Sequence, residues 1–79
     1  MKIFTQANYE DFVLRYSEVF VEDSFINWRS IRGTNIGVGY GFGGFQWFDR
    51  EEQISFEQVL ERVPPDVQEI LLFNLDLFR

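Results

Sequence analysis

The chain has 79 residues, 46% of them hydrophobic and 25% charged, a composition typical of one small globular domain and not of a disordered, collagen-like or long coiled-coil protein. It contains no cysteine and no histidine, which excludes disulfide frameworks, thiol nucleophiles, the common zinc sites and imidazole catalysis. Its net charge of −6 opposes direct binding to nucleic acid or to an anionic membrane.

The first predicted element is an amphipathic helix with Asn8 as its N-cap. Its apolar stripe consists of Tyr9, Phe12, Val13, Tyr16, Val19 and Phe20. Acidic residues on and after the opposite face are Glu10, Asp11, Glu18, Glu22 and Asp23. These carboxylates either solvate the helix or imitate a row of phosphates, and the second interpretation predicts a partner protein with a cationic surface. For residues 2–5 a strand and a leader both stay open.

Residues 24–49 change to an alternating apolar pattern, which predicts a three-stranded antiparallel meander. Gly43-Gly44, between Phe42 and Phe45, is typical of a two-residue hairpin turn that needs positive φ angles. This turn predicts three cross-strand pairs: Phe42 with Phe45, Tyr40 with Trp47, and Val38 with Asp49.

Two registers compete at the upstream turn, residues 32–35. A two-residue loop would place Arg29 beside Val38 and bury polar groups. A three-residue loop would instead place Trp28 beside Tyr40, so the sequence favours the three-residue loop. It predicts two rows on the core face: Ile26, Phe42 and Phe45, and Trp28, Tyr40 and Trp47.

The other face of this sheet is predicted to carry a strip without side chains, formed by Gly37, Gly39 and Gly41. Its predicted walls are Phe25, Asn27, Arg29 and Ile31 on one side, and Gln46 and Phe48 on the other. Because glycine costs a strand about 0.5–1 kcal/mol relative to alanine, something is expected to approach the backbone closely here. The occupant is either one of the chain's own helices or a partner's helix or extended peptide, with Asn27, Arg29 and Gln46 as polar contacts.

Two helices are predicted at the C-terminal end. A capping box at Ser55 opens a short helix that Pro64 must end. A second box at Asp66 opens a final helix to about Phe78. Its apolar residues, which cover nearly the whole circumference, are Val67, Ile70, Leu71, Leu72, Phe73, Leu75, Leu77 and Phe78. Such a helix is either enclosed by the core or in contact with another chain.

No motif indicates chemistry. The glycines at 39, 41 and 44 match the GxGxxG pattern of dinucleotide sites, but a strand follows them where that site needs a helix. The acidic run Asp49–Glu52 lacks the alternating ligands and turn glycine of a calcium loop. We therefore expect no enzymatic activity, no catalytic residue, no metal and no cofactor.

The sequence predicts an α+β fold for one domain over residues 1–79, in which a three-stranded antiparallel meander packs against an N-terminal amphipathic helix and two C-terminal helices. No stretch reaches the roughly 18 apolar residues of a membrane span. The first residues also lack the apolar segment of a signal peptide, so we expect a cytoplasmic protein, in its own cell or in an infected host.

The predicted function is that of a non-enzymatic protein-binding module, a small acidic inhibitor or adaptor that blocks a partner's surface. In size, acidity and lack of cysteine the chain is similar to small viral inhibitors of host nucleic-acid-handling machinery, including anti-CRISPR proteins, a similarity of class that no motif carries. The alternative is a homo-oligomeric structural or assembly factor, a homodimer included, which associates through the apolar C-terminal helix.

Overall fold

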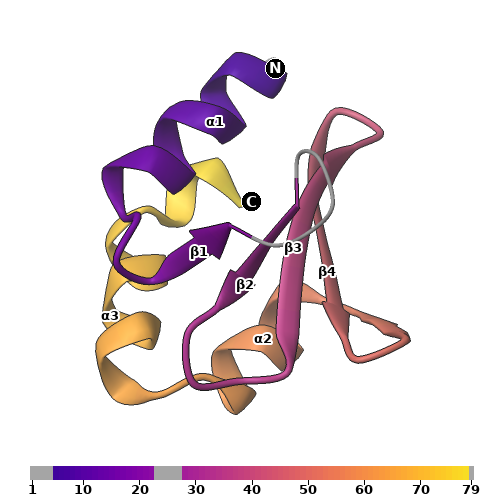
Figure 1. Cartoon of the computed structure of the whole chain (residues 1–79), viewed down its shortest axis with the longest axis vertical. Helices are drawn as coiled ribbons and strands as arrows, with labels where there is room; N and C mark the ends of the chain where they lie inside the picture. Colours follow the sequence, from indigo (N-terminus) through magenta and orange to yellow (C-terminus); the bar gives the residue numbers. More distant parts are fainter. Residues whose placement is uncertain (1–4, 23–27, 79) are drawn as a thin grey trace.

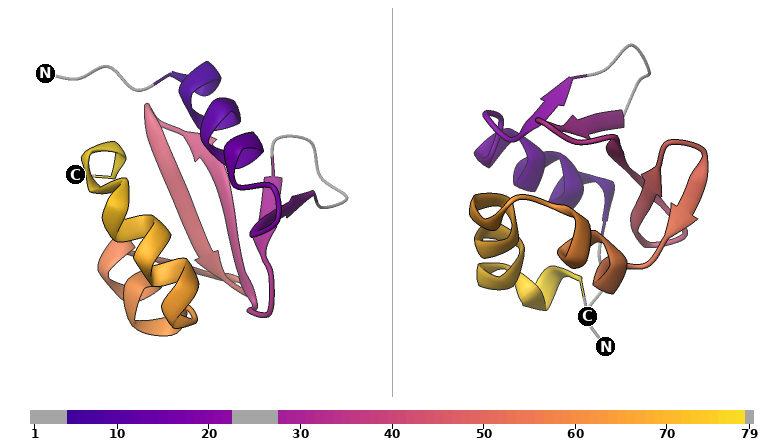
Figure 2. Two further views of the ribbon diagram at one scale, coloured as in Figure 1. Left: turned by 90° about the vertical axis from the view of Figure 1, so that its left-hand side faces the viewer. Right: turned by 90° about the horizontal axis from the view of Figure 1, so that it is seen from below.

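The computed structural model describes residues 5–22 and 28–78. Its elements are α1 (Gln6–Arg15), β1 (Phe20–Glu22), β2 (Trp28–Ile31), β3 (Ile36–Gly41), β4 (Gly44–Asp49), β5 (Glu52–Ile54), α2 (Phe56–Arg62), α3 (Pro65–Phe73) and the 3-10 helix η1 (Leu75–Leu77). The strands form one antiparallel sheet in the order β1-β2-β3-β4-β5, and the helices lie against one of its faces (Figures 1 and 2). The α+β prediction is confirmed, but the sheet has five strands where three were predicted.

Helix α1 starts and ends earlier than predicted. Its N-cap is Thr5, whose hydroxyl accepts the N–H of Asn8 at 3.2 Å while Asn8 Oδ1 accepts the N–H of Thr5 at 3.1 Å, so Asn8 is not the N-cap. The helix ends at Arg15. Val19, in the following turn, and Phe20, in β1, are both buried. The predicted apolar stripe still faces the core, because an edge strand continues the burial that the helix begins.

The β3–β4 hairpin turns at Phe42 and Gly43, not at the predicted Gly43 and Gly44. Phe42 and Gly43 have φ angles of 52° and 76°, as a type I′ turn requires. The predicted pairs are therefore wrong, and the observed ones are Gly41 with Gly44, Tyr40 with Phe45, Gly39 with Gln46, Val38 with Trp47, Gly37 with Phe48 and Ile36 with Asp49. The shift is an even number of residues, so every strand side chain keeps its predicted face.

The position of Asp49 explains this shift. The predicted turn would have set Asp49 opposite Val38, which is completely buried. In the observed register Asp49 lies opposite Ile36 at the end of the ladder, and its Oδ2 is 2.8 Å from Nη1 of Arg62 in α2. A carboxylate without a partner is costly to bury, so the register that exposes Asp49 to Arg62 is favoured over the simpler glycine turn.

Strands β2 and β3 pair in the register that sequence analysis rejects: Trp28 with Gly39, Arg29 with Val38, and Ser30 with Gly37. Arg29 tolerates this position because its guanidinium lies 3.7 Å from the carboxylate of Glu22, and its Nη1 donates to the carbonyl of Trp28 at 3.2 Å. The same register turns Ile31 to the core face, where it pairs with Phe20 of the neighbouring strand β1, and both side chains are buried. Burial of these two side chains offsets the cost of placing Arg29 on the core side.

The core lies between the sheet and the helices. Phe12 of α1, Phe45 of β4 and Phe78 after η1 form an edge-to-face triad, with ring centroids 5.6, 5.5 and 4.8 Å apart. Three members of the predicted rows do belong to this core: Tyr40, Phe45 and Trp47. Three other members do not: Phe42 is exposed, Trp28 lies on the far face, and Ile26 falls outside the described residues.

The glycine face, defined as the sheet face that carries Gly37, Gly39 and Gly41, is approached by Trp28. A Cβ atom added at Gly37 would lie 2.6 Å from Cε2 and 2.7 Å from Nε1 of the Trp28 indole. Trp28 also packs against Phe48, with centroids 5.5 Å apart. At Gly37 the expected close approach therefore comes from a side chain of the same sheet, not from a helix.

The C-terminal helices follow the predicted capping in part. The Ser55 box is present, and α2 ends before Pro64 as predicted. The N-cap of helix α3 is Pro64, not Asp66, and Pro65 takes the first helical position, where a proline loses no hydrogen bond. The helix ends at Phe73, and the predicted continuation to Phe78 is a 3-10 turn that returns Phe78 to the core.

We predict that Gly37→Ala lowers the unfolding free energy by about 1–3 kcal/mol, because the new methyl group displaces the Trp28 indole. Gly44→Ala is the matched control, since no atom lies within 4 Å of a Cβ added there. Chemical denaturation measures both. In the Trp28→Ala background the Gly37→Ala cost should largely disappear, and a cost that persists there would contradict the Trp28 contact.

Tyr9 ties α1 to the sheet, because its hydroxyl donates to the carbonyl of Val38 at 3.1 Å and burial raises its pKa to about 12. A tyrosine in the unfolded chain ionises near pH 10, at about its ordinary pKa. We therefore predict that Tyr9 stabilises the fold fully below that pH, and that this stabilisation is lost as pH rises toward 12. Denaturation across this range should show a steeper decline for the wild type than for Tyr9→Phe; parallel profiles would contradict the assignment.

Candidate functional site

The predicted acidic residues do not share one helix face. Glu10 and Asp11 lie in α1, Glu18 in the following turn and Glu22 in β1, while Asp23 falls outside the described residues. Asp11 pairs with Arg15 at 2.6 Å, and Glu22 lies 3.7 Å from Arg29. The early end of α1 at Arg15 therefore divides the proposed phosphate-like row between elements.

The other predicted contact residues are divided between the two sheet faces. Gln46 and Phe48 lie on the glycine face, Arg29 lies on the helix side, and Phe25 and Asn27 fall outside the described residues. A Cβ at Gly41 would meet Cγ of Gln46 at 3.3 Å, and Trp28 already covers Gly37. At these two glycines the predicted groove for a partner's helix or peptide is filled by the chain itself.

A different concave surface lies between α1 and the C-terminal helices. This helical groove, a cavity of about 310 Å³, is lined by Asn8, Asp11, Phe12, Arg15, Phe73, Asn74, Asp76 and Leu77. Asn74 holds its two walls together, because its Nδ2 donates to Tyr16 Oη at 3.1 Å and to the carbonyl of Ile70 at 2.9 Å. These hydrogen bonds thus hold the end of α1 against the C-terminal helices on both sides of the groove.

Phe73 is the most exposed apolar residue that lines this groove, at 84%, whereas Phe12 is buried and Leu77 is half-buried. Carboxylates of Asp11 and Asp76 lie around it, and only Asp11 has a basic partner among residues 5–22 and 28–78. Glu10 of α1 and Glu69 of α3 are exposed as well. An exposed ring inside an acidic rim suits an apolar side chain flanked by lysine or arginine.

Phe42 is the second exposed ring. At the tip of the hairpin it is fully exposed, at 102%, and its backbone is left-handed with φ 52°. A bulky side chain in this region is rare, and the conformation costs about 1–2 kcal/mol. The ring itself recovers none of this cost by packing within the chain; the cost is offset by the register that the turn sets, which places Asp49 beside Arg62.

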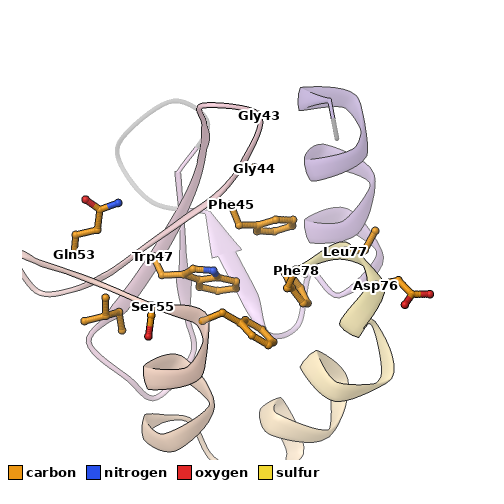
Figure 3. A pocket seen from close by; sticks show the side chains of 11 residues that line it. Gly43, Gly44, Phe45, Trp47, Gln53, Ser55, Asp76, Leu77 and Phe78 are labelled. Carbon is orange, nitrogen blue, oxygen red and sulfur yellow. The ribbon is translucent and has the colours of Figure 1, made fainter. Parts of the chain in front are cut away.

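A cavity of about 410 Å³ opens directly beside this tip. This hairpin pocket is lined by Gly43, Gly44, Phe45, Trp47, Gln53, Ile54, Ser55, Phe56, Asp76, Leu77 and Phe78. Figure 3 shows the rings of Phe45, Trp47 and Phe78 gathered at its centre, whereas the carboxylate of Asp76 points away from them. The interior is therefore aromatic and suits an uncharged apolar group.

Sequence reasoning missed both exposed rings. It assigned Phe42 to a core row because the glycine pair after it is the stronger local turn signal. It left Phe73 undistinguished, because all sides of the last helix carry apolar residues. Neither position has a local signal that could have separated it from its buried neighbours.

Comparison with protein-family models, with curated proteins and with solved structures finds no match to this chain. Within the described residues no group of three or more acidic, histidine or cysteine side chains could hold a metal ion. None of the helices in that part of the chain has the length and apolar character needed to cross a membrane. The chain's own surfaces are therefore what indicates its function.

We predict that Phe42→Asn raises the unfolding free energy by about 1 kcal/mol, because asparagine adopts positive φ more readily and Asn-Gly suits this turn. The melting temperature should rise by about 4–8 °C. Phe42→Leu is the control: it keeps the strained backbone, so its stability should stay within about 0.5 kcal/mol of the wild type. Loss of stability in Phe42→Asn would show that the ring does pack within the chain.

Proposed function

We propose that the chain is a non-enzymatic protein-binding module, an inhibitor or adaptor that docks its helical groove onto a cationic surface of another protein. The observation that carries this proposal is the position of Phe73, an exposed ring in a groove that Asp11 and Asp76 also line. Aromatic residues dominate interface energetics, and surrounding charges set the association rate and the choice of partner.

The charge of the whole chain supports the same partner chemistry. A net charge of −6 attracts a basic surface over a distance of about a Debye length, and acids of α1 and η1 would continue that attraction at contact. Under this proposal the cationic surface is one that otherwise binds a phosphate backbone. The chain would then act in the cytoplasm as an inhibitor of nucleic-acid-handling machinery, of the kind that small acidic viral proteins, including anti-CRISPR proteins, provide.

Self-association through α3 is the rival. It gains support from Leu72 and Phe73, which are adjacent and exposed on this helix. It loses support from Val67 and Leu71, which are buried in the chain's own core and are not available to another copy. The apolar surface left on α3 is therefore small for a stable oligomer.

A photo-crosslinking amino acid at position 73 tests the proposal. In cytoplasmic extract we expect a covalent adduct with a basic protein, reduced at least about tenfold when salt rises from about 0.05 to 0.5 M, since screening weakens the attraction. Asp76→Lys, which reverses a charge in the groove, should reduce the adduct to a similar degree.

Position 14 is the matched control, because Leu14 is also exposed, at 66%, but does not line the groove. Adducts of equal yield from positions 14 and 73, or none from 73, would overturn the proposal. An adduct of 73 with a second copy of the chain would support the self-association rival instead.

A further inference from the structure

Phe42 and the hairpin pocket form a complementary pair that does not include Phe73, although Asp76 and Leu77 line both the pocket and the helical groove. Phe42 projects from the tip at full exposure, and Gly43 and Gly44, the next residues, line the pocket. Because no atom lies within 4 Å of a Cβ added at either glycine, the entrance is open. A projecting ring and an aromatic cavity therefore sit side by side on one surface.

We propose that two copies of the chain associate about a two-fold axis, with Phe42 of each copy inserted into the hairpin pocket of the other. A two-fold interface uses the same patch on both copies, so a projection must have its matching cavity within that patch. Phe42 and the pocket meet this condition because they are adjacent in sequence and in space. The proposal also gives the exposed ring a role, since a side chain that packs against nothing within one chain becomes buried in the dimer.

The pocket has the size and lining that a phenyl ring needs. An apolar cavity of about 150 Å³ is sufficient to hold benzene, and the hairpin pocket measures about 410 Å³. Phe45, Trp47 and Phe78 would meet the incoming ring, and aromatic rings attract one another edge to face. The remaining volume of the cavity would receive the backbone of the entering tip.

The area buried decides how strong this dimer is. Each ring buries about 150–250 Å², so two rings and the walls around them remove roughly 600–1,000 Å² from water. Stable interfaces bury about 1,200–2,000 Å², which places this one among weak, reversible contacts. We expect a dissociation constant between about 10 µM and 1 mM, where a concentrated sample is a measurable mixture of monomer and dimer.

Salt should strengthen the dimer. Two copies that each carry a charge of −6 repel one another, and the apolar contact itself carries no ion pair. Raising the salt from about 0.05 to 0.5 M screens this repulsion and should tighten association several-fold. Binding of a cationic partner at the helical groove has the opposite dependence, so the two sites can be told apart.

Sedimentation equilibrium over about 10 µM to 1 mM tests the proposal directly. Phe42→Asn should weaken association at least about tenfold, because it removes the inserted ring while stabilising the fold. Gly44→Val should weaken it too, since the added side chain occupies open space beside the pocket. Phe73→Asn, which removes the other exposed phenylalanine ring, should leave the dissociation constant unchanged.

A photo-crosslinking amino acid at position 42 locates the contact. The expected product is a covalent dimer joined from position 42 of one copy to Trp47, Leu77 or Phe78 of the other. A monomeric mass at all concentrations, a dimer that persists in Phe42→Asn, or adducts away from the pocket would each overturn the proposal. An adduct of position 42 with a different protein would also overturn it, while leaving the proposal for the helical groove intact.

Discussion

The left-handed turn at Phe42 and Gly43 sets the register on which most other contacts depend. It places Val38 opposite Trp47 and Trp47 opposite Ile54, so three strands contribute side chains to one buried row. The glycine pair one residue later would be an easier turn, but it would set Asp49 against buried Val38. Long-range burial and a 2.8 Å ion pair between Asp49 and Arg62 thus outweigh about 1–2 kcal/mol of local strain.

The abundance of rings follows from the architecture. A small domain has helices for only one face of its sheet, so the glycine face must be covered by the sheet's own side chains. Trp28 does this, and it can do so because Gly37 leaves room for the indole. The aromatic residues therefore serve three ends: the triad around Phe12 fills the core, Trp28 and Phe48 cover the second face, and Phe42 and Phe73 remain exposed.

Much of the fold could be predicted from local patterns, and the failures have a common cause. Three predictions that depend only on neighbouring residues are confirmed. They are the Ser55 capping box, the end of α2 at the prolines, and the apolar faces of β3 and β4. Strands β1 and β5 have three residues each, too few for an alternating apolar pattern to be recognised in the sequence. The turn position and the Arg29 register depend on partners far along the chain, and the surface role of Phe42 depends on that turn.

Helix η1 joins the two surfaces, because Asp76 and Leu77 line both the helical groove and the hairpin pocket. The two cavities differ in chemistry because Asp76 directs its carboxylate away from the rings of the pocket (Figure 3). That charge therefore adds to the attraction that the groove exerts on a cation, and it adds little local repulsion where two pockets would meet. One element can thus separate an acidic surface from an apolar one. A chain of net charge −6 needs this separation if it is to bind a basic protein and also to form a dimer with its own copy.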